Sequence, residues 1–239
     1  MMARPIKGLL FDKDGTLFDF VASWAGVIDD TLAALTSDRG VQIVMARETG
    51  YDPVSGRFEP GSMAVAGALG EVAEIWARHL PGRTPAEVAK IADDIAEAAT
   101  GTLVPAVPDL PVLLDQLHAL GCVLGVATHD SEAAAHAHIA HVGATGHFSF
   151  VAGYDSGHGL KPGPGMLLAF AAATGLQPSD IAMVGDSVHD LGVAASAKAA
   201  MAIGVLTGPA QNSDLAPYAD HILPSIGALP ELLTALAKD

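Results

Sequence analysis

Residues 6–17 read IKGLLFDKDGTL, and the expected fold follows from this short stretch. Its first half is a short apolar run that stops at a charged turn, which is typical of a buried strand. Asp12 and Asp14 stand where that strand would end, and a spacing of two places both side chains on the same side of an extended backbone. Carboxylates this close repel each other, so at least one needs a proton or a cation. Mg²⁺ prefers such oxygen ligands.

Five later segments repeat this form, each one short, apolar and followed by Gly, Asp, Thr or Pro. Helical patterns lie between them, such as the leucines of residues 110–120 with Asp109 as the expected N-cap. The alternation predicts an α/β fold, a doubly wound and mostly parallel sheet with helices on both faces and ligands at the C-terminal ends of its strands. The five segments are Cys122–Ala127, Phe148–Ala152, Ile181–Gly185, Met201–Val205 and His221–Leu223.

Residues 19–104 interrupt this alternation, because they contain several helix-like segments and no convincing strand. One helix is predicted to begin after Thr84, with Pro85 in its first turn and Glu87 as the capping-box partner. We therefore expect an all-helical domain of residues 19–104, inserted into a core domain of residues 1–18 and 105–239.

Further chemistry-bearing side chains follow other predicted strands. Thr128 closes the second strand, and Lys161 follows the third. Asp186 and Asp190 come after the fourth. Because a doubly wound sheet brings its strand ends to one edge, we expect these side chains to meet the two N-terminal aspartates there. Four carboxylates, a hydroxyl and an ammonium suggest a site for a metal ion and a dianionic phosphate.

This set of motifs resembles that of the haloacid dehalogenase superfamily, specifically its phosphatases with a helical cap, of the phosphoglycolate phosphatase type. The resemblance covers nearly the whole chain: Asp-x-Asp-Gly-Thr at the first strand, Thr at the second, Lys-Pro at the third and Gly-Asp-x-x-x-Asp at the fourth. The place of the insertion, directly after the first motif, also matches. The resemblance implies a Rossmann-like core and a cap domain that shields the site and selects the substrate.

The resemblance also implies a role for each residue. Asp12 would be the nucleophile that takes the phosphoryl group as an aspartyl phosphate, and Asp14 would be the general acid and base. The side chains of Asp12 and Asp186 and the backbone carbonyl of Asp14 would hold Mg²⁺. Thr128 and Lys161 would bind the phosphoryl oxygens.

Asp190 has two interpretations at this point. By resemblance it supports the Mg²⁺ site as a fourth acidic residue. Its carboxylate could instead cap the helix that begins nearby, where it would satisfy free N–H groups.

The implied function is that of a Mg²⁺-dependent phosphoric monoester hydrolase acting on a small phosphorylated metabolite, with phosphoglycolate as the specific expectation. A phosphotransferase or phosphomutase on the same scaffold remains an alternative, in which a sugar hydroxyl takes the place of water. A phospho-accepting signalling module is a third, although such modules have no insertion after the first strand. Candidates to meet a second anionic group of the substrate are five arginines, most of them expected in solvent: Arg39, Arg47, Arg57, Arg78 and Arg83.

Several residues depart from the commonest family pattern or invite another interpretation. His129 stands where an asparagine often follows the phosphate-binding hydroxyl; we expect a structural histidine, the alternative being a donor to phosphate or substrate. Lys13, between the two aspartates, is expected to point away from the site. His136, His138 and His141 are not expected to form a metal site, because their spacing does not place all three on one helix face.

The composition excludes several classes of partner. The chain has 239 residues, with 12 Lys plus Arg against 27 Asp plus Glu and a formal charge of −15, which argues against DNA, RNA and anionic membrane surfaces. No apolar stretch reaches the ~20 residues that a membrane span needs. The single cysteine, Cys122, and the lack of a signal-peptide pattern predict a cytoplasmic protein. The sequence predicts no particular oligomeric state.

Overall fold

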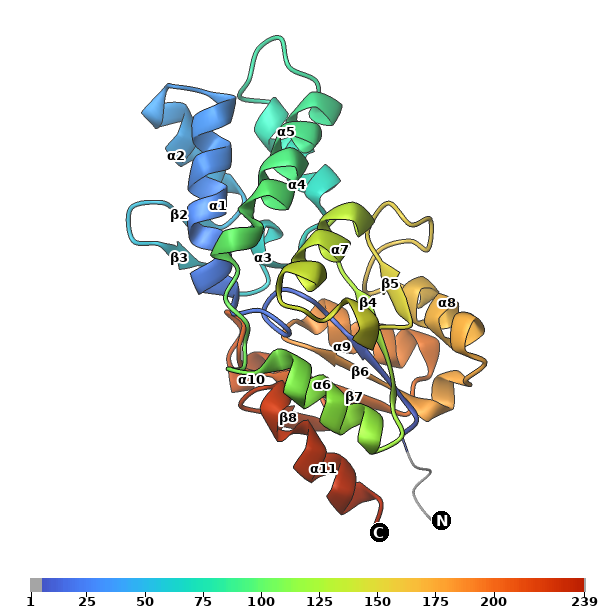
Figure 1. Ribbon diagram of the computed structural model, residues 1–239. Helices are drawn as coiled ribbons and strands as arrows, with labels where there is room; N and C mark the ends of the chain where they lie inside the picture. Colours follow the sequence, from blue (N-terminus) through green and yellow to red (C-terminus); the bar gives the residue numbers. More distant parts are fainter. Residues whose placement is uncertain (1–5, 239) are drawn as a thin grey trace.

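The computed structural model describes residues 6–238 and has a six-stranded parallel sheet at its centre (Figure 1). The strand order is β5-β4-β1-β6-β7-β8, so the first strand of the chain lies in the middle. This arrangement, with helices on both faces, confirms the predicted α/β fold class. The strands are β1 (Gly8–Phe11), β4 (Val123–Ala127), β5 (Phe150–Ala152), β6 (Ile181–Gly185), β7 (Met201–Val205) and β8 (His221–Leu223).

The two faces of the sheet are covered by different helices. Successive side chains of a strand point to opposite faces, so each strand contributes to the hydrophobic clusters on both. On β1, Leu9 and Phe11 belong to the hydrophobic cluster of one face, and Leu10 belongs to that of the other. The first face is covered by α6 (Leu110–Ala119), α7 (Glu132–His141) and α11 (Leu229–Leu236), and the second by α8 (Gly165–Thr174), α9 (Val188–Ala197) and α10 (Asn212–Leu215).

Residues 19–104, which we call the insertion, build a hydrophobic cluster of their own. In Figure 1 they form the blue-to-green part of the molecule at one end of the sheet. The division into a core of residues 1–18 and 105–239 and a cap of residues 19–104 stays a prediction, which this separate cluster supports; residues 1–5 and 239 lie outside the described residues. The helices are α1 (Phe20–Leu35), α2 (Arg39–Glu48), α3 (Met63–Ala66), α4 (Leu69–Ala77) and α5 (Pro85–Ala98).

The insertion is not all-helical, and that expectation is wrong. A short antiparallel hairpin joins α2 to α3, formed by β2 (Tyr51–Asp52) and β3 (Arg57–Phe58). The ring of Tyr51 stacks on that of Phe58, with 4.6 Å between the ring centroids. Strands of two residues are too short to show an alternating pattern, so the sequence carries no periodic signal for them.

The predicted helix starts are confirmed in one case and only in part in the other. At α5, the Glu87 carboxylate accepts from the Thr84 backbone N–H at 2.8 Å, and the Thr84 hydroxyl accepts from the Glu87 N–H at 3.3 Å. Asp109 does precede α6, but its side chain makes no capping hydrogen bond.

Two backbone segments connect the insertion to the sheet, and they lie side by side. The Asp19 N–H donates to the Val104 carbonyl at 2.8 Å, and the Ala106 N–H donates to the Leu17 carbonyl at 2.9 Å. Phe18 and Pro105 form an isolated antiparallel bridge between these two bonds. The chain therefore leaves the core and returns to it at one place.

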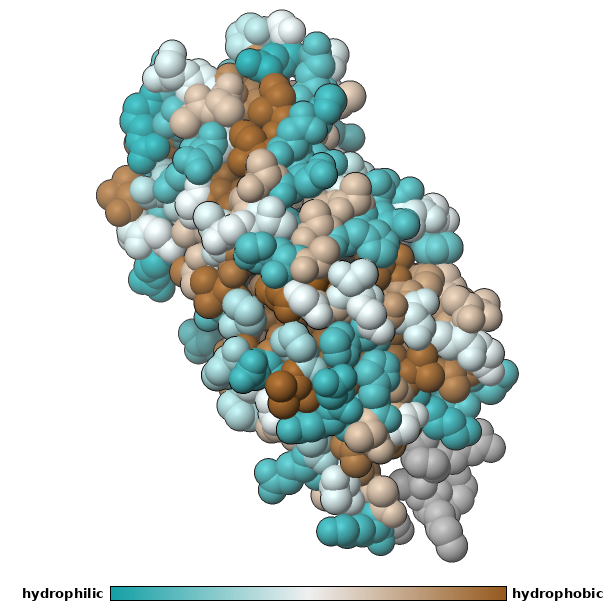
Figure 2. Space-filling model, in the orientation of Figure 1, coloured by the Kyte–Doolittle hydropathy of each residue, from teal (hydrophilic) through white to brown (hydrophobic). Residues whose placement is uncertain are grey.

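Among residues 6–238, no helix has the length and apolar character needed to cross a bilayer. On the face drawn in Figure 2, apolar side chains form separate groups among polar ones over both the insertion and the core. Exposed large apolar residues, such as Val54 and Tyr218, come from distant parts of the chain.

Candidate active site

Parallel pairing of β1 with β4 and β6 brings three predicted side chains to the same edge of the sheet. Asp12 follows β1, Thr128 follows β4 and Asp186 follows β6. Lys161 enters from the segment between β5 and α8, and Asp190 from the first turn of α9. All five residues are buried. The structure thus brings together side chains that the sequence separates by up to 178 positions.

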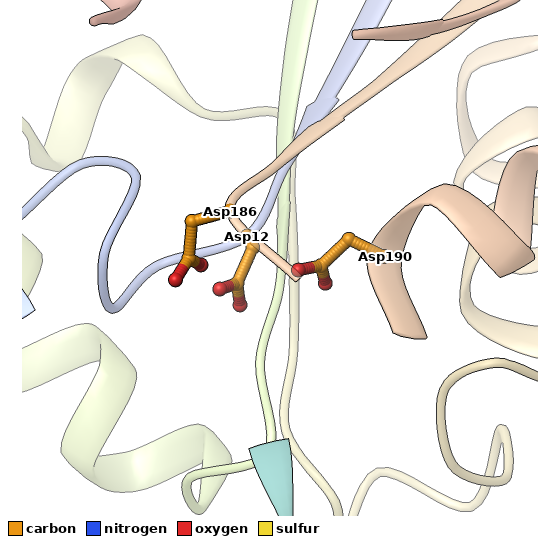
Figure 3. A group of neighbouring side chains, drawn as sticks. All are labelled: Asp12, Asp186 and Asp190. Atoms are coloured by element: carbon orange, nitrogen blue, oxygen red, sulfur yellow. The ribbon is translucent and has the colours of Figure 1, made fainter. Parts of the chain in front are cut away.

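Asp12, Asp186 and Asp190 form a buried carboxylate cluster, in which one oxygen of each lies within 4.8 Å of the others (Figure 3). Burial raises the pKa of Asp12 to about 7; the neighbouring Asp190 also raises it, and Lys161 opposes both effects. Burial, together with Asp12 and Asp190, raises the pKa of Asp186 well above its ordinary value. The protein alone thus disfavours charge on both Asp12 and Asp186 at this place, as expected of a site that a cation completes.

Lys161 is the cation that the chain itself supplies to this cluster. Its ammonium lies 2.6 Å from Asp12 Oδ1 and 2.7 Å from Asp190 Oδ1, and it also donates to the Ala127 carbonyl at 3.2 Å. Burial lowers the pKa of Lys161, but Asp12 and Asp190 outweigh this effect and the net shift is upward. The side chain is therefore a fixed positive charge beside Asp12.

The two interpretations of Asp190 turn out to be compatible. Its Oδ2 accepts from the Ser187 backbone N–H at 3.1 Å and from the Ser187 hydroxyl at 2.5 Å, while the Ser187 hydroxyl accepts from the Asp190 N–H at 3.3 Å. This is a capping box at the start of α9. Its other oxygen holds Lys161. Asp190 therefore caps the helix and positions the ammonium with the same carboxylate.

Asp186 is packed between two glycines. Gly15 has a φ of +84°, and a Cβ built on it would lie 2.4 Å from the Asp186 carboxylate. A Cβ on Gly208 would lie 1.7 Å from Asp186 Oδ2. That buried oxygen has no hydrogen-bond partner in the part of the chain that the structure describes. A buried carboxylate oxygen in this condition is costly unless a ligand satisfies it.

The Thr128 hydroxyl is held by a local turn. It accepts from the Asp130 backbone N–H at 3.1 Å, and the Thr128 N–H donates to the Ala152 carbonyl on β5. Because a hydroxyl can donate while it accepts, this turn leaves its hydrogen available for an anion at the strand ends.

The side chain of Asp14 does not belong to the carboxylate cluster, and its hydrogen bonds go to other residues. Its Oδ1 accepts from the indole Nε1 of Trp24 on α1 at 2.6 Å and from the Lys13 ammonium at 2.6 Å. Burial raises the pKa of Asp14, although Lys13 opposes this effect. The expectation that Lys13 points away from the site is therefore wrong: it is fully buried and contacts the predicted acid and base.

Lys13 continues into a network that sequence reasoning missed. Its ammonium lies 2.9 Å from the Asp130 carboxylate and 3.1 Å from His138 Nδ1, and His138 Nε2 lies 2.8 Å from the Ala96 carbonyl on α5. Burial and Lys13 lower the pKa of His138. One signal was available, since Asp130 follows Thr128 at the same spacing of two as the aspartates after β1.

One contact of His129 is structural, as the sequence led us to expect. Its Nε2 accepts from the Lys161 backbone N–H at 3.0 Å. The ring therefore helps to hold the segment that contains Lys161, and it also lines a cavity above the strand ends.

A cavity of about 120 Å³ lies above the strand ends and extends into the insertion. Asp12, Thr128 and Lys161 line one end, and mostly apolar side chains of the insertion line the other. The five candidate arginines of the insertion are all exposed, as expected for most of them, and none of them lines the cavity. Arg47, for example, pairs with Asp52 at 3.2 Å on the surface.

Comparison with known proteins gives consistent matches over most of the chain. A family model described as haloacid dehalogenase-like hydrolase matches residues 6–198. The phosphoglycolate phosphatase of Salmonella typhimurium is 30% identical over 227 residues, which cover 85% of this chain and 82% of the relative.

Solved structures share the fold at lower identity. A hydrolase from Pseudomonas syringae superposes with a TM-score of 0.71 at 19% identity, covering 95% of this chain and 98% of the other. A candidate β-phosphoglucomutase from Thermotoga maritima gives a TM-score of 0.68 at 16% identity, covering 96% and 99%. These likenesses show the fold alone.

Proposed function

This chain belongs to the haloacid dehalogenase-like hydrolase family, and we propose that it hydrolyses a small phosphorylated metabolite with Mg²⁺ through an aspartyl phosphate. The predicted enzyme class, a phosphoric monoester hydrolase, is confirmed, and the signalling-module alternative is thereby set aside. The observation that carries the mechanism is the buried Lys161 ammonium between Asp12 and Asp190, beside the unpartnered oxygen of Asp186.

The residues at the strand ends fit a divalent cation. The carboxylates of Asp12 and Asp186 are buried, close together and raised in pKa, and the free Oδ2 of Asp186 is a ready ligand. We propose that these two side chains and the backbone carbonyl of Asp14 hold Mg²⁺, while Asp190 supports the site through Lys161. The bound cation would reduce the repulsion between the carboxylate and the phosphate dianion.

Asp12 is the proposed nucleophile. As one of its oxygens forms a bond to phosphorus, the bond from phosphorus to the substrate oxygen breaks. Lys161 and the Thr128 hydroxyl bind the phosphoryl oxygens during this displacement, and Lys161 also keeps the Asp12 carboxylate oriented. A fixed ammonium suits this role because it can contact a carboxylate and a phosphate together.

Asp14 is the proposed general acid and base. Its raised pKa favours a carboxyl group that still holds a proton for the leaving alkoxide. After that transfer, the Asp14 carboxylate takes a proton from the water that attacks the aspartyl phosphate. Trp24 and Lys13 hold the side chain in one orientation through both steps.

Phosphoglycolate is the specific substrate expectation, because the Salmonella typhimurium relative is named for it. Transfer to a sugar hydroxyl is the alternative, which requires a phosphorylated product in place of free phosphate. A panel of phosphorylated metabolites compared by kcat/KM, with analysis of both products, separates the two reactions.

The first test is phosphate release from a generic aryl phosphate with Mg²⁺. Asp12→Asn is expected to abolish turnover because an amide cannot take the phosphoryl group, and Asp14→Asn is expected to slow it roughly 10²–10⁴-fold. Glu74→Gln, at an exposed carboxylate on α4, serves as the matched control and should retain wild-type rates. Equal rates for Asp12→Asn and wild type would contradict the nucleophile assignment.

A further inference from the structure

The cavity has two chemically different ends. Its core end carries Asp12, Thr128 and Lys161, which suit a phosphate and a cation. The lining contributed by the insertion is largely aromatic and aliphatic, and includes Phe20, Trp24, Ile28, Val65, Val72 and Trp76. The part of a substrate that leaves with the alkoxide oxygen would lie against this second lining.

Three side-chain donors at the insertion end are already bonded within the protein. The indole of Trp76 donates to the Met45 carbonyl at 3.0 Å, and that of Trp24 donates to Asp14. The Thr31 hydroxyl donates to the Val27 carbonyl at 2.8 Å. None of these three donors is left for a polar group of the substrate.

The charges at this end would repel a second anion. Asp93 of α5 lines the cavity, where it accepts from the Ser131 hydroxyl at 2.7 Å, and Asp130 lines it from the core. Lys161 is the one lysine or arginine in the lining, within the described residues 6–238, and it is committed at the phosphate end. The five arginines and Lys90 of the insertion are all exposed. A substrate carboxylate that lies against the lining of the insertion would therefore be desolvated without a lysine or arginine to pair with, which costs free energy.

We propose that the natural substrate carries an uncharged, predominantly apolar organic group on its phosphate, rather than a carboxylate as a second anionic group. This rests on the proposed phosphatase function and narrows its substrate class. It also departs from the specific expectation of phosphoglycolate, because, among the described residues, no lysine or arginine of the insertion lines the cavity to pair with a carboxylate.

The turnover test compares n-butyl phosphate with 4-(phosphonooxy)butanoate, because the distant carboxylate leaves the reactivity of the phosphate ester almost unchanged. The expected kcat/KM is at least about tenfold higher for n-butyl phosphate. The carboxylate of 4-(phosphonooxy)butanoate would have to be desolvated in the cavity without a countercharge. From ethyl to butyl phosphate, kcat/KM should rise roughly fourfold for each methylene that the lining buries. Equal or better turnover of the carboxylate ester, or a flat alkyl series, would overturn the proposal.

A pair of variants on α1 tests the lining directly. Ile28→Arg places a cation in the cavity, so it should lower kcat/KM for butyl phosphate and raise it for the carboxylate ester by about tenfold. Val21→Arg, on the same helix but exposed and outside the lining, should keep the wild-type ratio. An Ile28→Arg enzyme with the wild-type ratio would count against the proposal.

Binding gives a readout that needs no turnover. The two tryptophans of the sequence, Trp24 and Trp76, both line the cavity, so their fluorescence should respond to occupancy. In the presence of Mg²⁺, n-butylphosphonate should bind more tightly than 4-phosphonobutanoate, and the reverse order would refute the proposal. If no phosphate ester is turned over, the proposed function fails, and this titration alone still decides which group the cavity accepts.

Discussion

Lys13 is a buried cation whose acceptors come from three different elements. Asp14 follows β1, Asp130 follows β4 and His138 lies on α7. Burial lowers the pKa of Lys13, but the two carboxylates outweigh this effect and raise it. The ammonium thus remains charged and balances two partly buried acids that lie close together.

Lys13→Met should therefore destabilise the protein by about 3–5 kcal/mol, because it removes a fully buried ammonium and leaves two partly buried carboxylates without it. Urea unfolding measures this change. Lys90→Met is the matched control, since Lys90 pairs with Asp94 on the surface of α5 and should matter little. Adding Asp130→Asn to the Lys13 variant should restore part of the loss. Similar midpoints for the two lysine variants would contradict this role of Lys13.

The capping box at the start of helix α9 links the stability of that element to the candidate metal site. Ser187→Ala removes the hydroxyl that bonds both the Asp190 N–H and its carboxylate. The expected cost is about 1 kcal/mol of stability. Because Asp190 also holds Lys161, the Mg²⁺ concentration for half-maximal activity should rise roughly 10-fold or more.

Thr84→Ala at the start of α5 provides the comparison for Ser187→Ala. It removes an equivalent capping-box hydroxyl, but one that is exposed and outside the cavity lining. It should lower stability without changing the Mg²⁺ requirement. If both variants shift that requirement equally, the shift reports loss of stability rather than loosening of Asp190.

The elements that sequence reasoning predicts well are those with a local signal. Strands such as β1 and β6 are continuous apolar runs with a carboxylate at the end, so both the strand and the candidate site at its end could be inferred. The hairpin of β2 and β3 has no such run. Two of the three partners of Lys13, Asp130 and His138, lie more than 115 positions away, and contacts at that separation depend on how α7 packs against the insertion.

At the level of the whole molecule, the acidic site predicts how stability depends on pH. The pKa of Asp12 is about 7 in the folded protein against an ordinary value of 3.8. Between these values the folded state holds a proton that the unfolded chain has lost. The stabilising contribution of the protonated Asp12 carboxyl is therefore complete below about pH 4 and is lost as the pH rises to 7. The free energy of unfolding should fall by on the order of 4 kcal/mol over this range.

Unfolding in EDTA and in Mg²⁺, at pH 4 and pH 7, tests this dependence. Without metal, stability should fall as the pH rises, and Mg²⁺ should restore more of it at pH 7 than at pH 4 because carboxylates bind it when deprotonated. Asp12→Asn should flatten both dependences, whereas Glu74→Gln should not. A metal-free protein that becomes more stable from pH 4 to pH 7 would contradict the assignment.

The paired backbone segments at Asp19 and Val104 have a consequence for how such a chain diversifies. Because the chain leaves and rejoins the core at one bonded place, the length and content of the insertion can change without moving the strands that carry Asp12 and Asp186. The insertion supplies the apolar lining, and the sheet supplies the proposed reacting groups. The part of the chain that selects the substrate can thus evolve without changing the part that carries out the chemistry, because the backbone joins the two only through this pair of segments.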